Sequence, residues 1–143
     1  MFIGEYSHSI DEKGRVSLPV KFRARLASGC VLTRGIDKCL WVYPLDEWEK
    51  LADRISKLPI TQKDSRNFSR LILAGAMDLS IDKLGRINLP NYLKEYAGIK
   101  KKVTVTGMYN RIEIWPEETW SKFVKDMEDN SEAIAENLSE LGF

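Results

Sequence analysis

The chain has 143 residues, of which 43% are hydrophobic and 30% are charged, and its formal net charge is +1. This balance is typical of a globular protein and excludes wholesale disorder. The longest apolar stretch, residues 71–77, is far shorter than the roughly 20 residues that cross a membrane. The first fifteen residues contain five charges and no long apolar run, so no secretory signal is expected. Cys30 and Cys39 match neither a metal-ligand spacing nor a disulfide framework, which indicates a reduced, cytoplasmic protein.

The charge is distributed unevenly along the chain. Residues 126–143 contain six acids and no Lys or Arg, so residues 1–125 carry a net charge of +7. Residues 11–34 alone carry +4. A basic body with an acidic tail is compatible with a polyanionic partner, although the pattern by itself is not specific.

The sequence contains two copies of one module. Residues 2–19 and 73–90 are identical at eight of eighteen positions at an offset of 71. At an offset of 72 the match continues and aligns rare residues, such as Trp48 with Trp120. Composition bias does not align rare residues in this way, so we infer an internal duplication.

In the first copy, residues 11–14 have turn chemistry. Asp at the first position can accept hydrogen bonds from the following amides, and Gly at the fourth can adopt positive φ. A half-buried strand is predicted over 15–18, and Pro19 is suited to begin a short helix. The β-prone runs 30–33 and 39–43 predict a hairpin.

The second copy repeats this plan, and a further helix follows each hairpin. The corresponding elements are a turn at 82–85, a helix from Pro90 and a hairpin over 102–115. Apolar residues at helical spacing predict the further helices, which begin at Pro44 and Pro116.

Between the copies, residues 57–70 are polar, contain a break at Pro59 and lead into a helix. Near the end of the chain, Ile134, Leu138 and Leu141 have helical spacing and predict an amphipathic acidic helix. We therefore divide the chain into a first repeat (5–47), a helical connector (48–75), a second repeat (76–119), and a C-terminal helix with an acidic tail (120–143).

One copy has too few and too short strands to close a core alone. The simplest arrangement buries the apolar faces of both copies against each other and joins their strands in one barrel-like sheet. We predict an α+β, mainly β fold with short peripheral helices. Core packing is also favoured over base stacking for the four tryptophans, Trp41, Trp48, Trp115 and Trp120.

No feature of the sequence indicates an enzyme. The only histidine, His8, lies in a polar strand where a solvated position is expected. There is no phosphate-binding loop, no dinucleotide motif and no metalloprotease motif. We therefore expect no catalytic residues, no cofactor, no metal and no small-molecule substrate.

The duplicated Asp-x-x-Gly-Arg turn is the strongest candidate site. Asp and Arg can pair within the turn as a structural staple. Alternatively, Asp organises the turn while Arg serves as a fork-shaped donor for phosphates or guanine edges. The residues alone support both interpretations equally. The first copy is the more basic one, so we expect it to dominate any polyanion binding through residues that include Lys13, Lys21, Arg23 and Arg25.

The opening Met1-Phe2-Ile3-Gly4, the paired turns each followed by Leu-Pro, and the aromatic-Pro ends of the hairpins resemble the MraZ family of bacterial transcriptional regulators. The resemblance covers essentially the whole chain. It departs slightly at the hairpin ends, which are Trp41-Val42-Tyr43-Pro44 and Ile114-Trp115-Pro116.

This resemblance implies an AbrB/SpoVT-type swapped-hairpin fold in each copy, with both copies forming one pseudo-dimeric barrel. It also implies ring-shaped homo-oligomers that bind short direct repeats in double-stranded promoter DNA. The genes controlled, with repression the expected outcome, are those of the division and cell-wall cluster, including the protein's own operon. The implied location is cytoplasmic and nucleoid-associated, without membrane contact.

We predict five DNA-binding residues, Lys13, Arg15, Arg23, Arg25 and Arg86. Four further residues organise the turns, namely Asp11, Gly14, Asp82 and Gly85. The low charge per chain fits a multivalent binder, because a ring makes later contacts intramolecular and can raise avidity roughly 10² to 10⁴-fold. Two alternatives remain open: an antitoxin-like module that binds a protein, and a structural ring in which the arginines only staple the turns.

Overall fold

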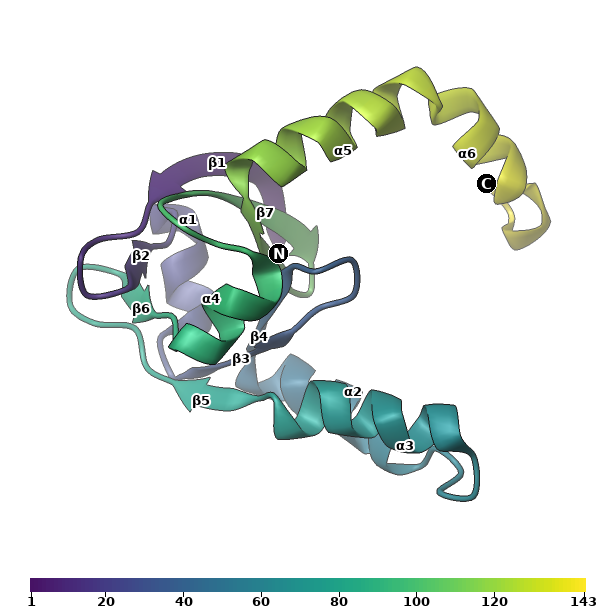
Figure 1. The fold of residues 1–143 in the computed structure, drawn as a ribbon, viewed down its shortest axis with the longest axis horizontal. Coiled ribbons are helices and arrows are strands. Elements are labelled where there is room, and N and C mark those ends of the chain that lie inside the picture. Colours follow the sequence, from purple (N-terminus) through teal and green to yellow (C-terminus); the bar gives the residue numbers. More distant parts are fainter.

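Two antiparallel sheets carry the fold, which a computed structural model describes over residues 1–143 (Figure 1). The larger sheet has six strands in the order β1-β7-β8-β4-β3-β5, and the smaller sheet pairs β2 with β6. The strands are β1 (Phe2–Ser9), β2 (Arg15–Ser17), β3 (Cys30–Arg34), β4 (Leu40–Pro44), β5 (Met77–Leu79), β6 (Arg86–Asn88), β7 (Lys102–Tyr109) and β8 (Ile112–Pro116).

Six α-helices accompany the sheets, and four of them start directly after a proline. They are α1 (Val20–Arg23), α2 (Leu45–Ser56), α3 (Lys63–Ser69), α4 (Asn91–Ala97), α5 (Glu117–Asp129) and α6 (Ser131–Asn137). A π-helical turn, Arg70–Ala74, continues α3, and 3₁₀ turns follow α1 and α6, at Ala24–Leu26 and Ser139–Leu141. Proline lacks the N–H that the first helical turn leaves unpaired. This confirms the helices predicted at Pro19, Pro44, Pro90 and Pro116.

The strand order reads the same when the two halves of the chain are exchanged. Replacing β1 with β5, β3 with β7 and β4 with β8 converts the order into its own reverse. A pseudo-twofold axis therefore passes between β4 and β8 and between β2 and β6. The first half's β1 pairs with the second half's β7, from Phe2 opposite Tyr109 to Ser9 opposite Lys102. In return, the second half's β5 pairs with β3.

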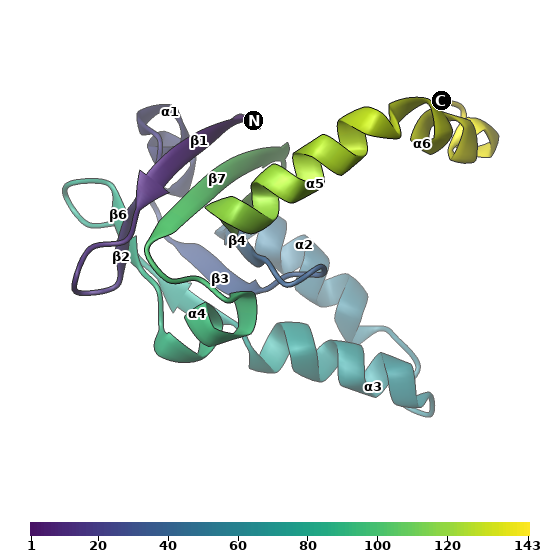
Figure 2. The same ribbon diagram turned by 45° about the horizontal axis from the view of Figure 1, so that its top comes forward.

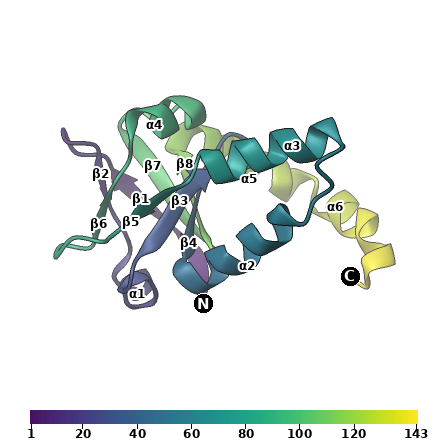
Figure 3. The ribbon, with the colours of Figure 1, turned by 90° about the horizontal axis from the view of Figure 1, so that it is seen from below.

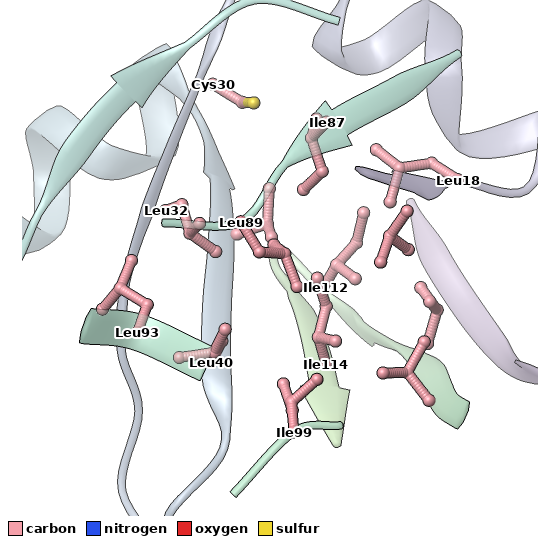
Figure 4. Packing of buried hydrophobic residues seen from close by; sticks show 14 of the residues in the cluster. Leu18, Cys30, Leu32, Leu40, Ile87, Leu89, Leu93, Ile99, Ile112 and Ile114 are labelled. Atoms are coloured by element: carbon pink, nitrogen blue, oxygen red, sulfur yellow. The ribbon is translucent and has the colours of Figure 1, made fainter. Parts of the chain in front are cut away.

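The larger core is shared by both halves (Figure 4). It contains 19 buried residues drawn from both sheets and from the helices α1 and α4. Val16 of β2 lies opposite Ile87 of β6, and both are fully buried. Removing apolar surface from water is the main stabilising contribution to folding. Because each half completes the core of the other, the predicted burial of the two copies against each other is confirmed.

The expected barrel is not closed. The strands β1 and β5 remain the two edges of the larger sheet, and β2 with β6 forms a separate sheet. Only a single bridge, between Ile10 and Val16, connects β1 to β2. Pairing ends there because the chain bends into the Asp-Gly turn at residues 11–14 and leaves only three residues for β2. The predicted α+β class is confirmed, whereas the closed barrel is wrong.

A second apolar cluster covers the opposite face of the larger sheet. It contains Trp41 and Trp115, which are buried, and packs against the half-buried Trp48 and Trp120. The core role predicted for the tryptophans is therefore confirmed. At its centre lies the buried carboxylate of Glu113. It accepts hydrogen bonds of 3.1 Å from each of the two buried indole N–H groups and further bonds from the guanidinium of Arg111.

Two helical arms leave the body at positions related by the pseudo-twofold axis (Figures 2 and 3). The first arm, residues 45–74, follows β4, and the second arm, residues 117–143, follows β8. The predicted helices of the connector and of the acidic tail are present as α3 and α6. Every residue from 125 onward is exposed, and α6 stands clear of the sheets (Figure 1). None of the helices combines the length and the apolar character that a membrane crossing requires.

Candidate nucleic-acid interface

The β2–β6 pair is a two-stranded ribbon with two unlike faces. Val16 and Ile87 lie on the buried face and fix the ribbon to the core. Side chains alternate along a strand, so the neighbours of these two residues lie on the other face. That polar face is partly or fully exposed and carries Arg15, Ser17, Arg86 and Asn88.

The turn before each strand is closed by its aspartate. In the first turn, Oδ1 of Asp11 accepts hydrogen bonds from the backbone N–H groups of Lys13 and Arg15, each 2.9 Å long. Gly14 adopts a φ of 78°, in the left-handed region that favours glycine. The second turn repeats both bonds at 2.9 Å, with a φ of 75° at its glycine. The predicted turn chemistry is confirmed in both copies.

The same bonds keep both aspartates ionised. The pKa values of Asp11 and Asp82 lie below their ordinary value, chiefly because the backbone N–H of the turn's arginine donates to the carboxylate. Hydrogen bonding to the ionised form favours that form. Each turn therefore holds a permanent carboxylate beside a permanent guanidinium at neutral pH.

The turns also hold each other across the ribbon. The backbone N–H of Leu18 donates to the carbonyl of Gly85 at 2.9 Å, and that of Leu89 donates to the carbonyl of Gly14 at 2.8 Å. Because the ribbon is antiparallel and three residues long, the turns lie at its two ends, about 10 Å apart. Both project from the same end of the molecule (Figures 1 and 2).

Each turn arginine donates one hydrogen bond through Nε and keeps two terminal nitrogens that make no hydrogen bond within the chain. Nε of Arg15 donates to Oδ2 of Asp11, and Nε of Arg86 donates to Oδ2 of Asp82, both at 2.7 Å. Their terminal nitrogens make no hydrogen bond within the chain, and the two side chains are 30% and 24% exposed. Nη1 of Arg86 also lies 3.8 Å from Oδ2 of Asp11. Each arginine is therefore paired with the aspartate of its turn, as the structural interpretation expects. Its two terminal nitrogens still form the donor pair that binding to phosphates or guanine requires.

Two further cations cross from one repeat to the turn of the other. Nε of Arg23 donates to the carbonyl of Leu18 at 2.9 Å, and its side chain lies directly against Gly85. Lys94 holds the matching position in the second repeat, where its Nζ lies beside Gly14. The α1 and α4 helices therefore each add one positive charge to the opposite turn.

Lys13 and Lys83 complete this group, which we call the turn cluster. Both are exposed and form no ion pair. The cluster contains six basic side chains and three carboxylates, a net charge of +3. Its cations are Lys13, Arg15, Arg23, Lys83, Arg86 and Lys94, and its acids are Asp11, Glu12 and Asp82.

Arg25, also predicted to contact DNA, lies outside the turn cluster. Its guanidinium donates to both carboxylate oxygens of Asp46, at 2.9 and 2.8 Å. It also lines a shallow pocket with Phe2, which begins β1. The turn follows the other end of β1, so Arg25 and the turn cluster lie toward opposite ends of that strand.

Three cluster or ribbon residues were missed by sequence analysis. Lys83 aligns with the oppositely charged Glu12, so the duplication does not point to it, and Asn88 is found only through strand alternation. Lys94 could have been found from the duplication, because it aligns with Arg23 at the offset of 71.

The histidine and the possible metal ligands of the chain form no further site. His8 is half-buried rather than solvated, and its pKa lies below the ordinary value because burial and then the nearby Arg23 disfavour the charged ring. It is therefore neutral at pH 7. No group of three or more His, Cys, Asp or Glu side chains is arranged to hold a metal ion.

Comparison with known families decides the identity. A sequence model of the family described as "MraZ protein, putative antitoxin-like" matches the chain twice, over residues 1–71 and 72–141. The chain belongs to the MraZ family. MraZ proteins are regulators of division-cluster transcription and are not enzymes.

The two MraZ repeats coincide with the halves that the pseudo-twofold axis exchanges. The boundary between them falls inside the π-helical turn Arg70–Ala74. As matched, each MraZ repeat includes most of one helical arm. The finer division at 5–47, 48–75, 76–119 and 120–143 stays a prediction.

Proposed function

We propose that this MraZ protein is a sequence-specific DNA-binding repressor of the division and cell-wall gene cluster, including its own operon. It binds short direct repeats in promoter DNA as a multivalent ring and associates with the nucleoid. Family membership supports the regulatory role, and the turn cluster supports the mode of binding.

The observation that carries this proposal is the pairing of the two turns across one ribbon. The polar face of the ribbon is about 10 Å long between its turns, and the major groove of B-DNA is about 12 Å wide and admits a two-stranded ribbon. The unoccupied terminal nitrogens of Arg15 and Arg86 match the two acceptors of guanine. Asn88 on the same face is suited to adenine.

The remaining cations of the turn cluster serve phosphates. Lys13 and Lys83 at the turn tips, with Arg23 and Lys94 behind them, flank the ribbon on both sides. Three of these four cations are lysines, which act as mobile point charges, and the guanidinium of Arg23 can bind a phosphate as well. One copy neutralises few phosphates and binds weakly, which is why assembly in a ring is part of the proposal.

The decisive experiment is fluorescence anisotropy with duplex DNA from upstream of the protein's own operon. We expect Arg15→Ala to abolish specific binding while size-exclusion chromatography shows an unchanged oligomer. Arg86→Ala should also weaken binding, because it removes the matching fork-shaped donor from the second turn. Wild-type affinity of Arg15→Ala would overturn the assignment.

Arg25→Ala serves as a matched control. It removes an arginine of the same repeat that is bound to Asp46 and lies outside the turn cluster. Unchanged DNA affinity would remove Arg25 from the interface, as its position suggests. A loss equal to that of Arg15→Ala would support the sequence-based prediction that Arg25 contacts DNA.

The family's description as antitoxin-like favours one second candidate, a module that binds a protein. The exposed second arm, with six acids between residues 126 and 143, offers a surface for a basic partner. A small protein that co-purifies with the full chain and is lost when this arm is neutralised would support that function. Promoter DNA that binds without any such protein would support repression.

A further inference from the structure

A run of three lysines lies beside only one of the two turns. Lys102 begins β7 opposite Ser9, and the carbonyl of Lys101 accepts a hydrogen bond of 2.7 Å from the backbone N–H of Ile10. The next residue is Asp11, which opens the first turn. Lys100, Lys101 and Lys102 are therefore joined by the backbone to the entrance of the first turn.

These lysines are available to an external anion. All three are exposed, and none lies within 4.0 Å of a carboxylate oxygen. They line an open cavity of about 670 Å³ together with the start of α5, where Glu117 and Glu118 are the acidic members. The nearby His8 carries no charge at pH 7. The run therefore adds positive charge to the first-turn side of the ribbon.

The second turn has no such neighbour. The duplication aligns Lys100–Lys102 with Ser28–Cys30, at the start of β3, and none of these three residues is charged. The turn tips offset this difference by only one charge, because Glu12 and Lys13 of the first turn align with Lys83 and Leu84 of the second, a net charge of 0 against +1. The backbone of the ribbon obeys the pseudo-twofold axis, whereas the charge around it does not.

We propose that Lys100–Lys102 bind backbone phosphates on the first-turn side and so fix the direction in which each subunit lies on DNA. A ribbon with true twofold symmetry fits a site equally well in two opposite orientations. Direct repeats all point the same way, so a binder that reads them must distinguish the two orientations. Three lysines on one side make one orientation neutralise more phosphates than the other. This inference rests on the proposed DNA binding.

The test compares the full-length protein with a triple variant, K100A/K101A/K102A, and a matched control, K122A/K125A, which removes exposed lysines of α5. The probes are fluorescent promoter duplexes shortened by a few base pairs at one end or at the other. Wild type and control should lose affinity when one particular end is shortened and tolerate shortening of the other. The triple variant should lose this difference and bind both shortened duplexes alike.

A second readout separates phosphate contact from damage to the fold. The log–log salt dependence of binding should become shallower by about 3 in the triple variant, since each phosphate contact contributes about 0.9. Specific and nonspecific duplexes should weaken by the same factor. Unchanged slope and unchanged end preference in the triple variant, with DNA still bound, would overturn this inference and leave the proposed function intact. A wild-type protein that binds no promoter DNA would overturn both.

Discussion

Gly14 and Gly85 occupy equivalent turns in unequal surroundings, and alanine at each measures the difference. Both have a positive φ, so alanine costs about 1–2 kcal/mol of backbone strain at either site. At Gly85 the new methyl carbon would lie 2.0 Å from Nε of Arg23, which has to leave its place. That displacement also breaks the hydrogen bond to Leu18, worth about 1 kcal/mol. Gly85→Ala should therefore cost about 2–3 kcal/mol.

At Gly14 the methyl carbon would meet Nζ of Lys94 at 3.2 Å, the mobile end of a flexible side chain. Gly14→Ala should therefore cost only the backbone strain. Gly98 is the reference, since its φ is 68° and nothing lies within 4 Å of an added methyl. Urea denaturation followed by tryptophan fluorescence gives the free energies. In thermal melts of a chain of this length, the melting temperature should fall by about 3 °C for each kcal/mol of lost stability.

The expected order is that Gly85→Ala is the least stable variant and that Gly14→Ala and Gly98→Ala resemble each other. Gly85→Ala should also weaken promoter binding, because Arg23 leaves the turn cluster. Equal unfolding free energies for Gly14→Ala and Gly85→Ala would refute the idea that Arg23 is wedged against the second turn.

Three other predictions concern the buried carboxylate, acid pH and salt. Glu113→Ala should lower the free energy of unfolding by about 2–4 kcal/mol, because two indole N–H groups and Arg111 lose their acceptor; a loss under 1 kcal/mol in urea denaturation would contradict this. The depressed pKa values of Asp11 and Asp82 stabilise the fold above their ordinary value, and this contribution is lost as pH falls through the folded-state values. Melting temperatures of the double variant D11N/D82N should therefore fall less steeply than wild type between about pH 5 and pH 2, and parallel curves would count against it. Wild-type promoter binding should show a log–log salt slope of about −6 if the four phosphate-facing cations of the turn cluster and Lys100–Lys102 each contact a phosphate, and a slope near zero would exclude the electrostatic account.

Elements encoded by neighbouring residues were predictable from the sequence. The turns follow from Asp and Gly at fixed positions, and helix starts follow from four prolines. The duplication also predicted that the two copies share one core, because neither copy is large enough alone. These inferences depend on chemistry within a few residues or on a comparison of the chain with itself.

Features that depend on long-range contacts were not predictable in the same way. Whether the sheet closes depends on how far β1 and β2 pair, and only a single bridge at Ile10 connects them. The packing of Arg23 against Gly85 joins the two repeats and leaves no local pattern. Arg25 looked equivalent to Arg23 in sequence, yet it follows the end of a four-residue helix and is drawn to Asp46 instead. The charge content of the sequence therefore does not show which basic residues come together in the turn cluster.

The interleaved strands have an evolutionary consequence. In a dimer of identical chains, one mutation alters both sides of the symmetry axis, so the partners can never specialise. Here a single polypeptide supplies both sides, and β1 and β5 each pair with a strand of the other half. Either half is therefore free to acquire its own surface, as Lys100–Lys102 and their uncharged counterparts Ser28–Cys30 illustrate, provided that the contacts linking the halves survive. Fusion of two copies in one chain therefore allows the two sides of a twofold-related pair to diverge separately.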